Sequence, residues 1–162
     1  MVSAAPTRWR ALTFARRLGR LARQPRDVPL LLRMGCFLWT APVRLGRSDL
    51  PAFLARLGAA RRPRAHDVGA GVARIARLRQ ALLRLPTLRG SNTCYVRALT
   101  LYRFLDPGDR QLRIHFGVEP GADPEDRLAG HAWITVDDEV IEPPDPLLQG
   151  RVHEIYCYPQ GA

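Results

Sequence analysis

The chain has 162 residues, and 46% of its positions are hydrophobic, which suits one compact domain with a buried core and leaves no room for a second full domain. All 25 basic residues are arginine, and the net charge is +10. Residues 1–90 hold 19 Arg and 3 acidic residues (net +16), and residues 91–162 hold 6 Arg and 12 acidic residues (net −6). This split is typical of a basic arm that binds nucleic acid, a membrane surface or an acidic peptide, or of basic helices that pack on an acidic half.

The three cysteines indicate a reducing compartment rather than a disulfide framework, because their number is odd and no secretory signal precedes them. We therefore expect a cytoplasmic protein. Cys36 lies in an apolar run and Cys157 in a strand-like one, and both are expected in the core. No CxxC or HExxH pattern is present, so we expect neither a metal site nor another cofactor.

The first part of the chain, residues 1–60, is predicted to be a basic helical region that precedes the core, residues 61–162. Residues 1–21 are amphipathic but lack the continuous apolar stretch of an export signal. The apolar segment 28–43 is interrupted by Arg33 and bracketed by prolines. It predicts a core helix, with an interfacial helix as the alternative, and no stable membrane span.

Two further helices are predicted from apolar stripes at helical spacing. The first begins at Asp49-Leu50-Pro51 and ends at Gly58. After a connector over residues 59–70, the second ends at Pro86 and should pack beside the helix that follows. Its stripe consists of Val72, Ile75, Leu78, Leu82 and Leu85.

Cys94 opens the next predicted helix. Ser91 or Asn92 can cap this helix, which places Cys94 in its first turn. There the helix dipole favours the thiolate, and the free N–H groups of the first turn can face an oxyanion. The helix ends at Asp106-Pro107-Gly108. The alternative is that Cys94 is a small buried hydrophobe at the start of a core helix.

A strand over residues 112–118 and a hairpin over residues 131–142 follow. His131 stands at the start of the hairpin and is the candidate base, and His115 on the earlier strand is its rival, although a surface position is expected for His115. Asp137-Asp138 makes a two-residue turn, which places Val136 opposite Glu139. A final strand is expected over residues 152–158.

The same hairpin count predicts the third member of the site. It puts Trp133 opposite Glu142, so that Glu142 shares a face with His131 and Asp145 points to the other face. A carboxylate there would fix the imidazole tautomer and stabilise the imidazolium. A three-residue loop or a bulge would reverse this assignment.

A capped helix that carries Cys, followed by an antiparallel sheet that carries His and an acid, resembles the transglutaminase-like, papain-related superfamily. More narrowly, three motifs resemble the leader peptidases of lasso-peptide biosynthesis, the microcin-processing group, from about Arg74 onward. They are Cys94-Tyr-Val-Arg-Ala-Leu99, Ile114-His-Phe-Gly-Val118 and His131-Ala-Trp133. That family usually carries Asp as the third member, whereas this chain offers Glu142 followed by two prolines.

The resemblance implies an α+β fold, with N-terminal helices and a transglutaminase-like core in which the Cys-bearing helix packs on an antiparallel sheet. It implies a cysteine peptidase with Cys94, His131 and Glu142 as catalytic residues. Its partners would be a precursor peptide, a separate leader-recognition protein and an ATP-using lasso macrocyclase.

Two alternatives use the same chain differently. Acyl transfer to an amine would use the same residues as hydrolysis. A non-catalytic basic module would bind an acidic peptide or nucleic acid, but the basic half shows no nucleic-acid recognition motif, so no nucleic-acid partner is expected.

Overall fold

The computed structural model describes residues 25–47, 49–59, 67–91, 93–119, 129–142 and 150–159. The predicted amphipathic arm over residues 1–21 and the acid candidate Asp145 lie outside these residues. The chain divides into two compact units, residues 1–33 and residues 34–162. The candidate site lies in the second unit, and the predicted domain boundary at residue 60 stays a prediction.

The described residues form six helical elements. The apolar stripes predicted for α3 and α4 are confirmed, because their central leucines and isoleucine are buried. The start of α4 lies earlier than predicted, because the Asp67 carboxylate caps it by accepting from the backbone N–H of Gly69 at 2.8 Å. The elements are η1 (Pro25–Asp27), α2 (Val28–Leu45), α3 (Leu50–Ala59), α4 (Val68–Leu83), η2 (Pro86–Ser91) and α5 (Cys94–Phe104).

The helix α2 is amphipathic rather than buried all round. Met34 and Leu38 are fully buried, whereas Trp39 is 64% exposed. Cys36 is two residues from each buried position, about 200° around the helix, and it is exposed. The prediction that Cys36 lies in the core is therefore wrong. Among the described residues, Pro25–Leu45 is the one helical stretch long and apolar enough to cross a membrane, a test that core helices also pass.

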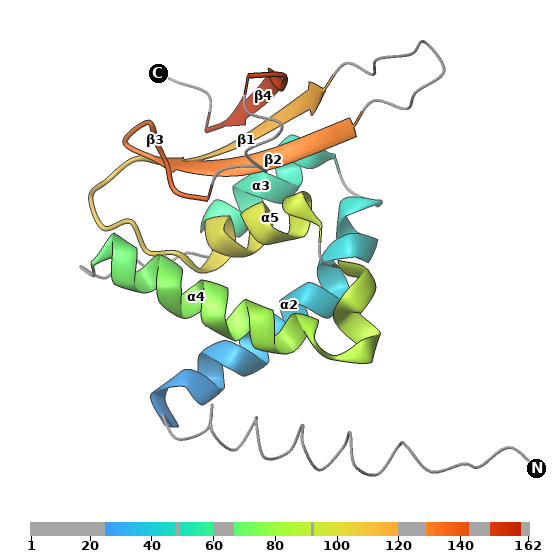
Figure 1. The fold of residues 1–162 in the computed structure, drawn as a ribbon, viewed down its shortest axis with the longest axis vertical. Helices are drawn as coiled ribbons and strands as arrows, with labels where there is room; N and C mark the ends of the chain where they lie inside the picture. Colours follow the sequence, from blue (N-terminus) through green and yellow to red (C-terminus); the bar gives the residue numbers. More distant parts are fainter. Residues whose placement is uncertain are drawn as a thin grey trace, which may run out of the picture. The chain divides into compact units, whose positions relative to one another are not determined.

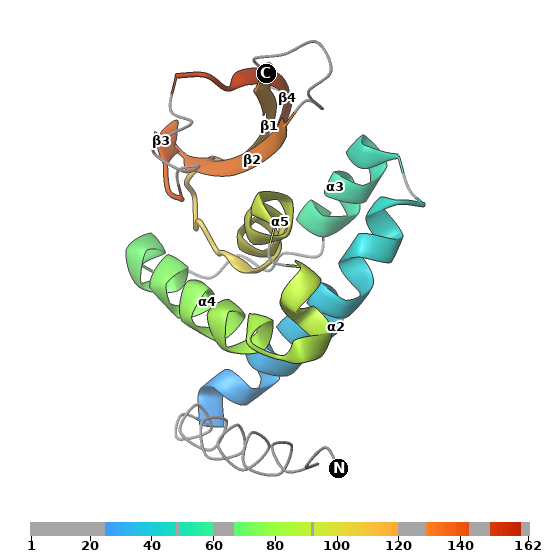
Figure 2. The ribbon, with the colours of Figure 1, turned by 45° about the vertical axis from the view of Figure 1, so that its right-hand side comes forward.

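Four antiparallel strands make one sheet, and the predicted α+β class is confirmed. The strands are β1 (Leu112–Glu119), β2 (Ala129–Val136), β3 (Glu139–Val140) and β4 (His153–Tyr158), and their order across the sheet is β3-β2-β1-β4. Figures 1 and 2 show α5 lying against β2, with α4 on the side of α5 away from the sheet. The predicted packing of α4 beside α5 is thus confirmed.

Both faces of β1 are covered at its centre. Ile114 and Phe116 are buried on the face toward α5. On the other face His115 is only 8% exposed, because the Trp133 ring stacks on it with an interplanar angle of 7°. The prediction of a surface position for His115 is wrong, since β1 lies between β2 and β4 and its non-apolar face is covered as well.

The hairpin between β2 and β3 has the predicted two-residue loop. Asp137 and Asp138 both have positive φ, 50° and 66°, and Val136 pairs with Glu139. Positive φ at both loop residues is the geometry that hairpins with the right-handed strand twist require. The Asp137 carboxylate fixes the loop by accepting from the Gln111 backbone N–H at 2.8 Å and from Arg110 Nε at 2.7 Å.

These hydrogen bonds predict an acid-sensitive hairpin. The Arg110 hydrogen bond, followed by that from the Gln111 backbone, lowers the pKa of Asp137. The folded pKa lies below the unfolded value of about 3.9, so the contribution is present above that pH and is lost as the pH falls through the folded pKa. In urea unfolding, Asp137→Asn should be less stable than wild type at pH 7, and the difference should shrink below about pH 4. Glu139→Gln is the control, and a pH-independent difference for Asp137→Asn would contradict the assignment.

Candidate active site

Cys94 is the first residue of α5. The N-cap is Thr93, whose hydroxyl accepts from the Val96 N–H at 3.3 Å. The predicted cap at Ser91 or Asn92 is wrong, because the 3-10 helix η2 runs to Ser91 and moves the cap to Thr93. The prediction that Cys94 lies in the first turn is confirmed. Its thiol is therefore at the positive end of the α5 dipole, beside first-turn N–H groups that have no partner within the helix.

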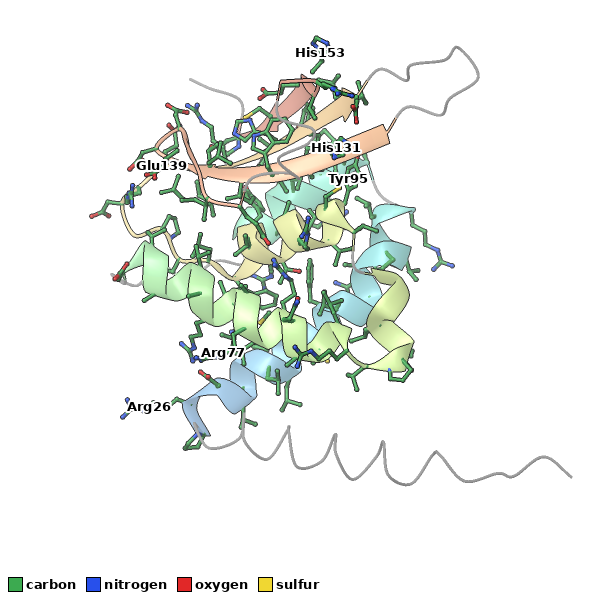
Figure 3. All side chains as sticks on the ribbon, in the orientation of Figure 1. Arg26, Arg77, Tyr95, His131, Glu139 and His153 are labelled. Atoms are coloured by element: carbon green, nitrogen blue, oxygen red, sulfur yellow. The ribbon has the colours of Figure 1, made fainter. Side chains whose placement is uncertain are left out.

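The Cys94 thiol contacts the beginning of β2. Its Sγ donates to the carbonyl oxygen of Gly130 at 3.5 Å, and Cys94 itself is half-buried. Gly130 directly precedes His131 in the chain. Figure 3 shows Tyr95 and His131 at the same end of β2, away from Glu139. The start of the helix and the start of the strand thus meet at the residues predicted to carry the chemistry.

Gly130 is required where it stands, because Tyr95 packs directly on it. A Cβ atom at Gly130 would collide with the Tyr95 hydroxyl and lie 3.0 Å from the ring carbon that bears it. Burial, and after it the charge of Cys94, raises the pKa of Tyr95. A neutral, half-buried tyrosine therefore stands next to Cys94 at the start of α5.

His131 lies on the opposite face of the sheet from the α5 contacts. Ala132 and Ile134 are buried toward α5, and alternation turns the His131 ring to the other face. There its Nε2 is buried, lies 3.8 Å from a Glu119 carboxylate oxygen and makes no hydrogen bond with any described residue. Among the residues that the structure describes, no hydrogen bond joins Cys94 to His131. Because Cys94 lies on the α5 side of β2 and the His131 ring on the other, a pair between them requires the ring to turn toward the thiol.

Glu142 is held by an arginine of α4. Its Oε1 lies 2.6 Å from Arg79 Nη2 and its Oε2 lies 3.0 Å from Arg79 Nη1, while Nη1 also donates to the Arg97 carbonyl at 3.3 Å. The Arg79 side chain is 5% exposed. The hairpin register is the predicted one, but β3 ends at Val140 and the chain bends at 141–142, so strand alternation no longer sets the direction of Glu142. The structure thus brings Glu142 to Arg79 rather than to His131, and it brings Glu119 to His131.

A small pocket lies between α5 and β2 beside the thiol. Its lining includes Cys94 and Ala98 from α5, Ala132 from β2, and Glu142. Glu142, held by Arg79, therefore forms part of the wall of a pocket that Cys94 also lines.

Sequence reasoning missed two residues of this site. Arg79 follows the buried Leu78 on α4, and the apolar spacing of that helix gives no sign that Arg79 is buried as well. Glu119 ends β1 on the same face as His115, but its nearness to His131 depends on the β1–β2 register, in which Gly117 pairs with His131.

A steric prediction follows from the Tyr95 contact. Gly130→Ala should lower the free energy of unfolding by about 1–3 kcal/mol, because the new methyl group forces Tyr95 out of place. In Tyr95→Ala the same Gly130→Ala change should cost far less, which a double-mutant cycle from urea unfolding measures. Gly35→Ala is the control, since its Cβ would meet only Leu82 Cδ2 at 3.7 Å. Equal costs in both backgrounds would contradict the contact.

Comparison with known proteins supplies the remaining observation. A model of the transglutaminase-like superfamily matches residues 37–156. The match spans α3, α4, α5 and the first three strands, with Cys94, Glu119, His131 and Glu142 inside it. No curated protein and no solved structure matches the chain.

Proposed function

Because the chain belongs to the transglutaminase-like superfamily, we propose that it is a cysteine peptidase in which Cys94 is the nucleophile and His131 its general base. One observation carries the proposal. The thiol of Cys94, at the first position of α5, contacts the carbonyl of the residue directly before His131. A helix N-terminus favours the thiolate, and a histidine one residue beyond the contacted carbonyl can act as its base once its ring turns to the thiol.

The proposed reaction uses each group in turn. His131 takes the thiol proton, and the Cys94 sulfur attacks the carbonyl carbon of the scissile peptide bond. N–H groups at the start of α5 donate to the oxyanion. The C–N bond breaks with proton transfer from His131 to the leaving amine, which leaves a thioester on Cys94. Water, deprotonated by His131, then hydrolyses the thioester.

Glu119 is the proposed positioning residue for His131. Its side chain is 16% exposed and one carboxylate oxygen stands 3.8 Å from Nε2, and a hydrogen bond forms if the two groups approach to about 2.6–3.2 Å. That bond would fix the imidazole tautomer and stabilise the imidazolium. Glu142, the acid predicted from the hairpin count, is assigned instead to the pocket wall through Arg79.

The proposed substrate is a ribosomally made precursor peptide whose leader is removed during lasso-peptide maturation. The motifs that begin at Cys94 and His131 support this assignment by resemblance, and the arginine-rich first half suits an acidic peptide segment. A leader-recognition protein and an ATP-using macrocyclase would act beside it. Transfer of the acyl group to an amine remains the second outcome of the same thioester, which an added amine would reveal as a ligated product.

The proposed pair of Cys94 and His131 predicts which variants lose cleavage activity. Cys94→Ala and His131→Gln should each lower kcat for cleavage of a lasso-type precursor peptide by at least about 10³-fold, because both act in one chemical step. His115→Gln and Cys157→Ala are matched changes at a histidine and a cysteine outside the proposed pair, and both variants should retain most activity. Mass spectrometry of the released leader measures the rate. Full cleavage by a folded Cys94→Ala protein would overturn the proposal.

Kinetics and unfolding measurements distinguish the proposed roles of Glu119 and Glu142. Glu119→Gln should lower kcat by about 10–100-fold with little change in KM, because a positioning carboxylate acts in the chemical step. Glu142→Gln should lower the free energy of unfolding by about 2 kcal/mol, because it leaves the buried Arg79 charge without its partner. The opposite pattern, a selective kcat loss for Glu142→Gln and none for Glu119→Gln, would restore Glu142 as the partner of His131.

A further inference from the structure

A second group of chemistry-bearing side chains lies on the sheet face that α5 does not cover. His115 on β1 and Glu154 and Cys157 on β4 each offer one ligand atom, and these atoms all lie within 4.8 Å of one another. His115 is buried, Cys157 is half-buried and Glu154 is exposed, so the group opens to solvent on one side. None of the three belongs to the proposed peptidase site.

An irregularity in β4 is what brings the three together. Cys157 pairs with His115, but Glu154 is three residues from Cys157 and would face the other side of a regular strand. The β1–β4 register shifts between Phe116 and Gly117, so that Gly117 pairs with Glu154 and Ile155 is left out of the pairing. The bulge therefore turns Glu154 onto the face of His115 and Cys157, and it leaves Ile155 65% exposed.

The His115 ring is held in place from several directions. Its Nδ1 lies 2.8 Å from Glu154 Oε2, its Nε2 lies 2.8 Å from Thr135 Oγ1, and its face stacks on Trp133 at a centroid distance of 5.4 Å. The Cys157 Sγ stands 4.0 Å from Nε2. A fixed imidazole with a carboxylate and a thiol beside it is preorganised for a ligand rather than for movement.

The thiol, imidazole and carboxylate of this group stand in the same order as in a catalytic triad. Two observations argue against a catalytic role. Burial, and after it the charge of Glu154, raises the pKa of the Cys157 thiol. No helix N-terminus supplies oxyanion donors here, since Cys157 lies within a strand. A bound cation would favour the thiolate in spite of this burial, because the cation replaces the thiol proton and balances the carboxylate charge.

We propose that His115, Glu154 and Cys157 form a binding site for Zn²⁺. Thiolate, imidazole and carboxylate are the three ligand types that zinc combines in proteins. Nδ1 of His115 is the nitrogen that can share a metal with Glu154, because it faces that carboxylate while Nε2 hydrogen-bonds with Thr135 Oγ1. The ligand atoms of the group lie within 4.8 Å of one another. Tetrahedral geometry with Zn–S at about 2.3 Å and Zn–N at about 2.0–2.1 Å sets sulfur and nitrogen about 3.5 Å apart, so binding would draw the thiol toward the ring. Three protein ligands leave the fourth position to water.

A metal ion at this site would cross-link the edge strand β4 to β1. In the described part of the sheet, β4 lies at one edge and pairs with β1, so a metal shared by the two strands adds a cross-link between them. Because the ligands come from β1 and both ends of the bulge, binding should raise the stability of the folded chain.

The experiment uses the full chain with Zn²⁺ alone, and Co²⁺ as its coloured substitute. Wild type should bind one Zn²⁺ per chain by calorimetry, unfold at a higher temperature with Zn²⁺, and show thiolate-to-cobalt charge-transfer absorption with Co²⁺. Cys157→Ser and Glu154→Gln should each weaken Zn²⁺ affinity at least tenfold, and Cys157→Ser should abolish the charge-transfer band. Cys36→Ser is the matched control on the exposed cysteine and should change neither.

Circular dichroism of each variant without metal checks that the fold is intact, and the exposed Glu154 provides a change that leaves the core untouched. Loss of the band in Cys94→Ala with its retention in Cys157→Ser would overturn the proposal by moving the site to the peptidase thiol. Absence of Zn²⁺ binding by the folded wild-type chain would overturn it as well.

Discussion

The contact between the start of α5 and the start of β2 is the constraint on which the site depends. Thr93 caps the helix so that Cys94 is its first residue, and the Cys94 thiol donates to the Gly130 carbonyl. Any side chain at position 130 would strike Tyr95, so the approach of helix and strand requires glycine there. The same contact brings the thiol to the residue directly before His131 and leaves it beside the first-turn N–H groups of α5.

The ion pair between Arg79 and Glu142 shows how the charge asymmetry of the chain is used. Arg79 belongs to the basic half and Glu142 to the acidic half, and their bidentate contact joins α4 to the end of the hairpin. A buried guanidinium is stable only with such a partner, since an unpaired buried charge is costly. At this point the basic helices pack on the acidic half, which was one of the two explanations for the split. The other, a basic surface for an acidic partner, rests on residues such as 1–21 that lie outside the described chain.

Local patterns in the sequence predicted most of the fold. Apolar spacing gave α3, α4, α5 and β1, and Asp137-Asp138 gave the hairpin loop, because these features depend on residues within one or two turns of each other. Failures arose where distant segments decide. Cys36 is exposed because α2 buries only one face, and His115 is buried because Trp133 and β4 cover it. Glu142 turned to Arg79 because β3 ends after two residues, and the closeness of Glu154 to His115 depends on a bulge. None of these tertiary choices has a signal in local spacing.

The most direct test of the account is the rate at which each cysteine is alkylated by iodoacetamide at pH 7, followed by peptide mass spectrometry. If Cys94 and His131 act together, Cys94 should react faster than Cys36, although Cys36 is exposed and Cys94 only half-buried, because the thiolate is the reactive form and the histidine takes its proton. His131→Gln should abolish that advantage, and His115→Gln should preserve it. Slower reaction of Cys94 than of Cys36, unchanged by His131→Gln, would contradict the central claim that these two residues form a catalytic pair.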